Sequence, residues 1–425
     1  MRPRTRWRQR GVCALGMSAA LMVSAAACGS SGGSSGGSSP GSTDSAAAQS
    51  LGPSKPATGD ELKIGFITDG SGTTLDNSTE VAAAQAATSY VNDYQGGVAG
   101  HRLSLTVCNT KQTPAGATDC ANQMTAAKVP VVLMNNSGNV TPVFKVLSAA
   151  KVPLVLDING DESTLGAKSG AYILVSPLTA ALAGPAQVAK DAGAKKAAIF
   201  VLDVPGATGP VNSLDKIFYA KANVGLTIQP IPPGTADATP QVQTVLAGKP
   251  EQVNLVGDPT FCTGVLKALK TLGYSGSIVL QSQCVSPGAA AGIPGGYDGM
   301  KVVSGQTTNV ADPEYKLYLA AMKKYQPDTD PTAKSLTAGG WVVTLGFSRA
   351  MAGLTAPVTS AGVEKALATM PKTKLPLGGT ATFQCDGKQV SITPAVCSTG
   401  GLVQTLDEKG KPTSEQPLDV SSVLP

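Results

Sequence analysis

The sequence predicts an α/β protein of two lobes, each built on a parallel sheet. Short apolar stretches alternate with helical patterns from about residue 62 to residue 156, and the alternation starts again after residue 180. This spacing of strands and helices is typical of parallel sheets with helical crossovers. The length of 425 residues also exceeds what one hydrophobic core usually serves. Two α/β units of similar size are therefore expected.

The first unit opens with an apolar strand at residues 62–67, which ends in the polar loop 68–72. The expected order that follows is helix 79–94, strand 103–107, helix 115–128, strand 129–134, helix 140–150 and strand 152–156. His101 falls in a glycine-rich turn before the second strand, where we expect it to be solvated.

The second unit repeats the pattern. The expected order is helix 181–192, strand 197–202, helix 213–222, strands 225–229 and 252–257, a helix around 265–272, and strands 277–280 and 301–305. Val265, Ala268, Leu269 and Leu272 define one face of its last helix, at offsets of three, four and seven. A long helical region at 312–354 contains Trp341, a further helix covers 360–369, and the tail from Gly379 is predicted to be a β-hairpin pinned by Cys385 and Cys397.

The amino terminus has the pattern of a secretion signal. Residues 1–10 contain five arginines and no acidic residue, and residues 11–27 are small and apolar. This stretch is too short for a stable membrane span. Without these five arginines, the 33 basic residues fall to 28, which equals the 28 acidic ones. The balance leaves no basic face for nucleic acid.

Residues 24–28 (SAAAC) resemble the bacterial lipobox, in which the cysteine is lipidated after cleavage. Ala25 departs from the leucine that this motif prefers. The resemblance implies a signal peptide at 1–27 and a lipid anchor at Cys28. The composition that follows predicts a Gly/Ser-rich flexible tether at 28–59. The alternative is an ordinary signal peptide cleaved near Ala27, with Cys28 left as a spare thiol.

Six cysteines remain after the leader and the anchor: Cys108, Cys120, Cys262, Cys284, Cys385 and Cys397. An even number in an exported protein predicts disulfides. Fifteen pairings are possible, and proximity in sequence favours 108–120, 262–284 and 385–397. The cysteines form no Cys-x-x-Cys pair, so redox catalysis and structural zinc are poorly supported.

The inventory of reactive residues argues against an enzyme. The chain has one histidine, no phosphate-binding Gly-x-x-x-x-Gly-Lys motif, and a Gly-x-Ser-x-Gly match only inside the Gly/Ser-rich stretch. A nucleophile elbow needs a strand before it and a helix after it. We therefore predict no catalytic residue, no metal and no cofactor.

Short motifs occur in a characteristic order along residues 60–422. They are 62–65 (LKIG), 96–101 (GGVAGH), 151–155 (KVPLV), 296–300 (GYDGM), 313–315 (PEY) and 338–341 (AGGW). Together they resemble the type 1 periplasmic-binding-protein fold, specifically the branched-chain amino-acid binding proteins of ABC importers. Cys108 and Cys120 also lie where members of that family often have a disulfide.

The resemblance implies two lobes joined by three crossings. We expect these near residues 177–180, 305–308 and 377–381, which gives an N-lobe of 60–177 with 307–377 and a C-lobe of 178–306 with 378–422.

It also implies a function, which is to close both lobes on a small polar solute and deliver it to ABC permease subunits. The expected solute is an amino acid or a related compound such as an amide, amine or polyol. The expected protein is a monomeric lipoprotein, anchored through Cys28 to the outer face of the cytoplasmic membrane of a Gram-positive or actinobacterial cell. The alternative is an anchored sensor of the same fold without a transport role.

Ligands of open α/β sheets bind at the carboxyl ends of strands. The loop after the third strand holds the ligand carboxylate in amino-acid-binding relatives, and this chain has Asn135, Asn136 and Ser137 there. Asn159 and Asp161 follow the fourth strand. Because Asp161 would repel an acid, it puts a simple α-amino acid in doubt and favours an amide, amine, polyol or sugar-like solute.

Six further candidates complete the expected site. They are Ser71 and Gly72 after the first strand, and Asp203, Asp258, Phe261 and Gln283 in the second unit. Helix capping is the other interpretation for the polar residues, and core packing is the other interpretation for Phe261.

Overall fold

The structure is a computed structural model, and it describes residues 49–71, 77–285, 287–332, 336–355 and 357–425. Among these residues, five parallel strands form a first sheet in the order β2-β1-β3-β4-β5. The strands are β1 (Gly59–Thr68), β2 (His101–Asn109), β3 (Val132–Met134), β4 (Leu154–Leu156) and β5 (Ala171–Ile173).

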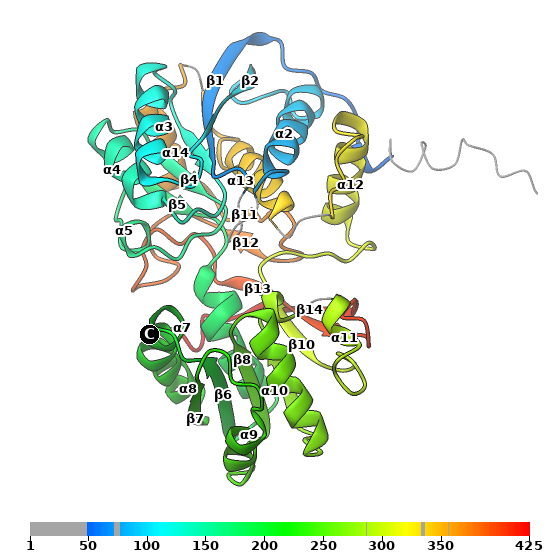
Figure 1. Cartoon of the computed structure of the whole chain (residues 1–425). Coiled ribbons are helices and arrows are strands. Elements are labelled where there is room, and N and C mark those ends of the chain that lie inside the picture. Colours follow the sequence, from blue (N-terminus) through cyan, green and yellow to red (C-terminus); the bar gives the residue numbers. More distant parts are fainter. Residues whose placement is uncertain (1–48, 72–76, 286, 333–335, 356) are drawn as a thin grey trace, which may run out of the picture. The chain divides into compact units, whose positions relative to one another are not determined.

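Both faces of the first sheet are buried. Leu154 and Leu156 face one core, which includes α3 (Pro114–Ala126) and α4 (Val140–Ala149). Val155 faces the other, which includes α2 (Glu80–Tyr94), α12 (Pro313–Tyr325), α13 (Thr337–Ala350) and α14 (Ser360–Thr369). Figure 1 shows α3 and α4 on one side of these strands and α2, α12 and α13 on the other. Burial on both faces explains why β3 and β4 are apolar throughout, whereas the edge strand β2 alternates.

A second sheet has seven strands in the order β14-β13-β10-β9-β8-β6-β7. Five are parallel: β6 (Lys196–Leu202), β7 (Gly225–Ile231), β8 (Gln252–Val256), β9 (Ser277–Leu280) and β10 (Lys301–Ser304). β13 (Gly400–Leu406) and β14 (Pro412–Asp419) are antiparallel and extend the β10 side.

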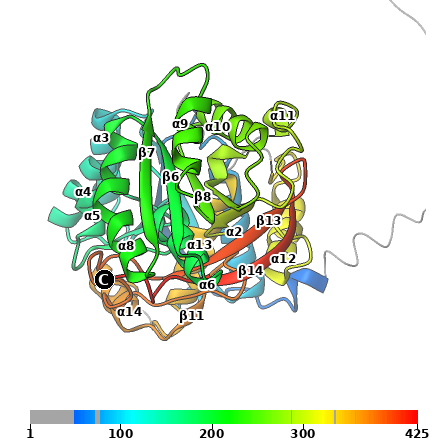
Figure 2. The same cartoon turned by 90° about the horizontal axis from the view of Figure 1, so that it is seen from below.

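Helices also cover both faces of the second sheet. Figure 2 shows α8 (Lys216–Lys221) on one side of β6 and β7, and α9 (Thr239–Leu246) and α10 (Pro259–Thr271) on the other. The remaining helices are short or irregular: α5 (Glu162–Leu165), α6 (Gly184–Asp191), α7 (Pro205–Pro210), α11 (Pro287–Ala290), and the turns η1 (Thr179–Ala183), η2 (Val211–Asp215) and η3 (Ser282–Cys284). The two parallel sheets and their helices confirm the predicted fold class.

The three predicted disulfides are present, as Cys108–Cys120, Cys262–Cys284 and Cys385–Cys397. Most predicted strands and helices also lie within a few residues of those observed. The long helical region at 312–354 is two helices, α12 and α13.

The predicted carboxyl-terminal hairpin is wrong in its position. The hairpin is β13–β14, and it begins after both cysteines. Residues 382–397 instead accompany the first sheet, since the Cys397 N–H donates to the Ile173 carbonyl of β5 and the Cys385–Cys397 pair lies in the α2–α13 core. β11 (Thr373–Lys374) and β12 (Thr382–Phe383) form a small sheet there. The chain therefore joins the second sheet at Gly400, later than the expected crossing at 377–381.

Candidate functional site

The carboxyl ends of β1, β3 and β4 bring three loops of the first sheet together, because these strands are parallel neighbours. We call this region the first-sheet edge. Asp69, directly after β1, is 2% exposed. Its carboxylate accepts hydrogen bonds from the Thr110 hydroxyl and, at 2.8 Å, from the Ser137 hydroxyl. The Ser137 hydroxyl also accepts from the Asn139 N–H at 2.9 Å. Ser137, expected to hold a ligand carboxylate, is thus committed to an internal one.

A second carboxyl lies beneath the same edge. Glu80, in the first turn of α2, is fully buried, and its Oε2 accepts from the amides of Asn77 (2.9 Å) and Asn135 (2.7 Å). Burial raises the pKa of Glu80 to about 7; the charge of Asp69 acts in the same direction, whereas the hydrogen bonds from Thr68, Asn135 and Asn77 oppose the shift. The raised pKa favours the protonated form of this carboxyl compared with an exposed glutamate.

Two glycines let α13 approach this cluster. A Cβ at Gly339 would lie 2.2 Å from Asn135 Oδ1, and one at Gly340 would lie 2.0 Å from the Glu80 carbonyl. A side chain at Gly340 would push α13 away from α2, and one at Gly339 would displace the Asn135 amide. The Asn135 amide completes the junction with a 2.9 Å bond to the Leu336 carbonyl.

Asp157, directly after β4, connects the edge to the segment between the two sheets. It is 1% exposed, and its Oδ2 accepts from the Gln306 amide at 2.9 Å. Gln306 follows β10 of the second sheet. Burial raises the pKa of Asp157 to about 8, opposed by the Gln306 hydrogen bond and assisted by the Glu80 charge. Asp157 is therefore mostly protonated at pH 7.

The loop after Asp157 carries two predicted site residues. Asn159 is buried, and its amide donates to the Ser137 carbonyl at 3.1 Å and to Asn136 Oδ1 at 3.5 Å. Asp161 is half-buried and caps α5, accepting from the Ser163 N–H and the Thr141 hydroxyl, both at 2.9 Å. Burial opposes its ionisation, but the bonds from Ser163 and Thr141 outweigh it and hold the pKa below the ordinary value. Asp161 is thus a fixed negative charge.

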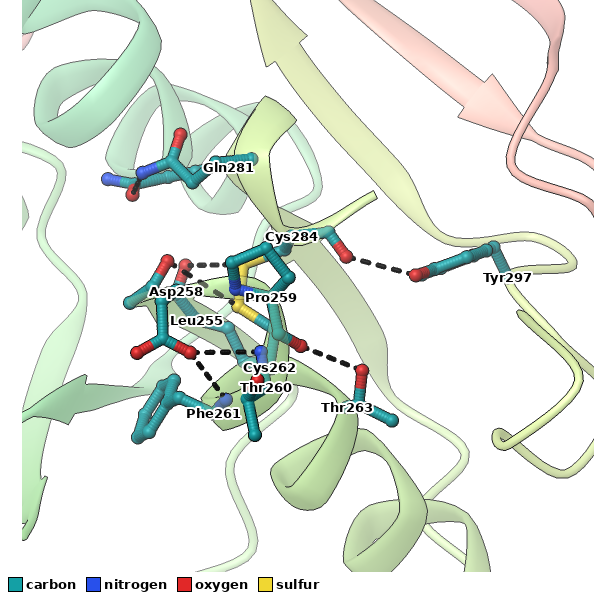
Figure 3. Close-up of a disulfide and its surroundings, with 12 residues drawn as sticks. Leu255, Asp258, Pro259, Thr260, Phe261, Cys262, Thr263, Gln281, Cys284 and Tyr297 are labelled. Carbon is teal, nitrogen blue, oxygen red and sulfur yellow. Dashed lines mark hydrogen bonds between the residues drawn. A yellow bond between two sulfur atoms is a disulfide. The ribbon is translucent and has the colours of Figure 1, made fainter. Parts of the chain in front are cut away.

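The carboxyl ends of β6, β7, β8 and β9 form the corresponding second-sheet edge. Asp203 and Asp258 are exposed there, after β6 and β8. The Asp258 carboxylate caps α10 by accepting from the N–H groups of Thr260 and Phe261, each at 2.9 Å (Figure 3). The capping interpretation of Asp258 is therefore satisfied in the structure. Phe261 is half-buried and packs partly against the core of the second sheet.

A disulfide joins two loops of the second-sheet edge. Cys262 in α10 and Cys284 in η3 are both fully buried, and their bond ties the loop after β8 to the loop after β9 (Figure 3). Gln283, a predicted site residue in the second loop, is exposed, and its amide donates to Gln281 Oε1. The disulfide thus fixes the relative position of Asp258, Phe261 and Gln283.

The structure brings the predicted residues together in two sets. Asn135, Asn136, Ser137, Asn159 and Asp161 share the first-sheet edge, with Ser71 exposed beside them, and Asp203, Asp258, Phe261 and Gln283 share the second. Gly72 and Cys28 lie outside the described residues. Glu80, Asp157 and Gln306 were not among the predicted residues. The position of Asp157 directly after a strand was a usable signal, whereas Glu80 falls within a helical pattern.

Two further observations concern the described part of the chain only. It contains no group of three or more His, Cys, Asp or Glu side chains that could hold a metal ion. None of its helices has the length and apolar character needed to cross a membrane.

The sequence profile of the periplasmic binding proteins matches residues 61–394. The chain belongs to this family. The family comprises binding proteins rather than enzymes, in agreement with the predicted absence of catalytic residues. No curated protein matches the chain in a sequence comparison.

Solved structures show the same fold at low identity. A putative branched-chain amino acid ABC transporter protein from Rhodospirillum rubrum has a TM-score of 0.69 and 14% identity, with 82% of this chain and 98% of that one covered. A branched-chain amino acid transporter substrate-binding protein from Streptococcus pneumoniae, in complex with isoleucine, has a TM-score of 0.61 and 17% identity, with coverages of 84% and 99%. An R. palustris solute-binding protein in complex with 4-hydroxybenzoate has a TM-score of 0.60 and 18% identity, with coverages of 84% and 97%. At these identities the likeness establishes the fold of this periplasmic binding protein.

Proposed function

We propose that this periplasmic binding protein is the solute-binding lipoprotein of an ABC importer and that its solute is neutral or cationic. The solute would bind between the first-sheet edge and the second-sheet edge and favour the closed arrangement of two lobes. Cys28 would carry the lipid that holds the protein at the outer face of the cytoplasmic membrane.

The chemistry of the strand ends supports this solute class. The three residues that follow each of β1, β3, β4, β6, β8 and β9 include Asp69, Asn135, Asp157, Asp203, Asp258 and Gln281, and no Lys, Arg or His. Lys111 follows β2, which is at the edge of its sheet. A carboxylate solute would therefore meet Asp161 without a nearby cationic partner, at a cost in desolvation and repulsion.

The relatives differ in what they bind. The protein from Streptococcus pneumoniae was solved with isoleucine and the R. palustris protein with 4-hydroxybenzoate. In this chain, the hydroxyl expected to receive such a carboxylate is Ser137, which donates to Asp69. The proposal therefore places the solute among amides, amines, polyols or sugar-like compounds rather than among acids.

A thermal-shift screen of the purified, oxidised protein tests the proposal. The panel holds aliphatic amino acids, amides, polyamines, sugars, polyols and aromatic acids. A solute present at a hundred times its Kd adds about 2.7 kcal/mol to the folded state. We expect a shift from an amine, amide or polyol; a shift from aliphatic amino acids or aromatic acids alone would contradict the proposed solute class.

Asp161→Asn provides a matched test of the charge. Asn caps helices about as well as Asp does, so the substitution removes the negative charge and keeps the cap of α5. We expect the affinity for a cationic solute to fall about tenfold. Asp330→Asn is the control, because Asp330 accepts from the Thr332 N–H and hydroxyl in the same local pattern, in the connection between α12 and α13. Equal effects of the two substitutions would argue against a role of Asp161 in binding.

The anchor has its own test. Cys28→Ser should abolish incorporation of labelled fatty acid and release the protein from the membrane fraction. Retention of the label in this variant would contradict lipidation at Cys28.

A further inference from the structure

The second-sheet edge contains a small pocket beside Asp258. It has a volume of about 90 Å³ and lies between the ends of β6 and β7 and the first turns of α10. Its apolar walls are Leu202, Ile231, Pro232, Phe261 and Val265. About 10–15 Å³ of such space is enough for one water, so the pocket has room for a group of several heavy atoms.

The Phe261 ring is held in this wall by its local structure. The Asp258 cap fixes the first turn of α10 by accepting from the Phe261 N–H. Gly257 allows the ring to lie against the end of β8, because a Cβ there would be 2.4 Å from Phe261 Cδ1. Figure 3 shows the ring turned away from the Cys262–Cys284 bond. The following residue, Cys262, is therefore anchored in the core while Phe261 faces the pocket.

The charges around the pocket are negative. Its lining contains Asp258 and no Lys, Arg or His. Asp203 is also close, because its N–H donates to the carbonyl of the wall residue Ile231 at 2.9 Å. Asp237 precedes the lining residue Ala238, and the charge of Lys267 in α10 acts on its carboxylate. The exposed Asp258 thus lines a largely apolar cavity, and the exposed Asp203 directly follows the wall residue Leu202.

We infer that this pocket is a subsite for the apolar end of an organic amine. The walls would bury an alkyl or aryl group, and the carboxylates of Asp203 and Asp258 would attract the ammonium group that it carries. The inference rests on the proposed function, since it assigns the apolar part of the solute to the second-sheet edge. Any further polar groups of a larger solute would then face the first-sheet edge.

Titration followed by NMR of the Ile, Leu and Val methyl groups tests the subsite in the full-length protein. Benzylamine and methylamine are the probes, because they share the ammonium group and differ in the apolar group. We expect saturable shifts of the Leu202, Ile231 and Val265 methyls with benzylamine, and binding of methylamine at least about tenfold weaker.

Gly264→Leu is the blocking variant. Gly264 lines the pocket on the exposed side of α10, and a Cβ there meets nothing within 4 Å. A leucine therefore fits at the rim of the pocket without displacing a neighbour, where we expect it to restrict entry. Thr271→Leu is the control, because it adds a leucine to an exposed position at the other end of the same helix. The variant should weaken benzylamine binding at least tenfold, and the control should leave it unchanged.

Three results would overturn the subsite: no saturable shift of these methyls, shifts that persist in Gly264→Leu, or loss of binding in both variants. The methyl titration is read independently of the solute screen. If the pocket methyls stay silent while a polar solute still stabilises the protein, the subsite is wrong and the proposed function stands. If no solute stabilises the protein, the proposed function fails.

Discussion

The acidic residues at the carboxyl ends of the two sheets differ in burial and in charge. At the first-sheet edge, Asp69, Glu80 and Asp157 are buried, and their oxygens accept hydrogen bonds from side chains. At the second-sheet edge, Asp203 and Asp258 are exposed and stand beside an apolar pocket. If a solute binds between the two edges as proposed, the residues after each strand decide what can bind there.

Burial accounts for the difference in charge. Desolvation raises the pKa of both Glu80 and Asp157. At pH 7 it therefore favours the neutral, protonated form of these two carboxyl groups of the first-sheet edge. Under the proposed function, a solute would therefore meet fewer charges at this edge than the number of acidic residues suggests. Asp161, whose pKa is held below its ordinary value, would be one of them. A polar neutral or cationic group fits these surroundings.

The largest predicted effect tests the buried carboxyls. Because the pKa of Glu80 is raised from about 4.5 to about 7 on folding, the folded state holds more protons than the unfolded state in this range. Stability from this group is therefore present below pH 4.5 and lost as the pH rises to 7, by about 3 to 4 kcal/mol. Glu80→Gln should remove that fall in a series of denaturant unfolding measurements.

The pH series contains its own control. Below pH 4.5 Glu80 is protonated in both states, so the wild type and Glu80→Gln should have similar free energies of unfolding there. Asp157→Asn should likewise remove a fall in the free energy of unfolding as the pH rises, over a pH range that extends to about 8. Parallel curves for wild type and variants from pH 4 to 8 would contradict the assigned neutral carboxyls.

The next effect concerns the disulfide of the second-sheet edge. Replacing Cys262 and Cys284 with alanine should lower the free energy of unfolding by about 3 kcal/mol, because the unfolded chain loses a 22-residue constraint. Hydrogen exchange should also become faster at residues 257–261 and 281–285, since the bond joins these loops.

The first sheet supplies the control for this disulfide. Removing Cys108–Cys120, with a separation of 12 residues, should cost a similar free energy of unfolding. It should leave exchange at 257–261 and 281–285 unchanged. If both double variants loosened these loops equally, Cys262–Cys284 would have no particular role in positioning them.

The smallest predicted effect compares two helix caps. Asp258 caps α10 at the second-sheet edge, and Asp312 caps α12 by accepting from the N–H groups of Glu314 and Tyr315. Each substitution by alanine should cost about 1 kcal/mol in free energy of unfolding. Only Asp258→Ala should also shift the NMR signals of the Leu202 and Ile231 methyls, because Asp258 fixes Phe261. Unchanged methyl signals would show that the pocket does not depend on this cap.

Sequence patterns correctly predicted those strands and helices that are marked by residues close to them in the sequence. The strand at 277–280 and the helix at 360–369 match β9 and α14. Gly276 precedes the strand, and the buried Val363 and Leu367 are spaced by four in the helix. Proximity also predicted the three disulfides. The hairpin failed because Cys385 and Cys397 close a short loop on the first sheet, and the turn that separates β13 from β14 comes later.

The candidate site was predictable only in part, because its side chains contact residues that are far away in the sequence. Loops after strands could be located from the strand pattern, which placed Asn135, Asn159 and Asp258 correctly at the edges. The partner of each side chain depends on contacts across many residues, such as Gln306 with Asp157, 149 positions apart. Sequence alone therefore could not show that Ser137 is bound to Asp69 or that Asp157 is largely neutral.

The most direct test of the account uses solutes that differ only in charge. Thermal shifts of the oxidised protein at pH 7 would be measured for matched pairs of amines and carboxylic acids, including 4-hydroxybenzylamine and 4-hydroxybenzoate. The account predicts that stabilisation is confined to the amine of each pair, because the two edges present Asp161, Asp203 and Asp258 to the solute. Stabilisation by the acid and not by the amine would contradict it.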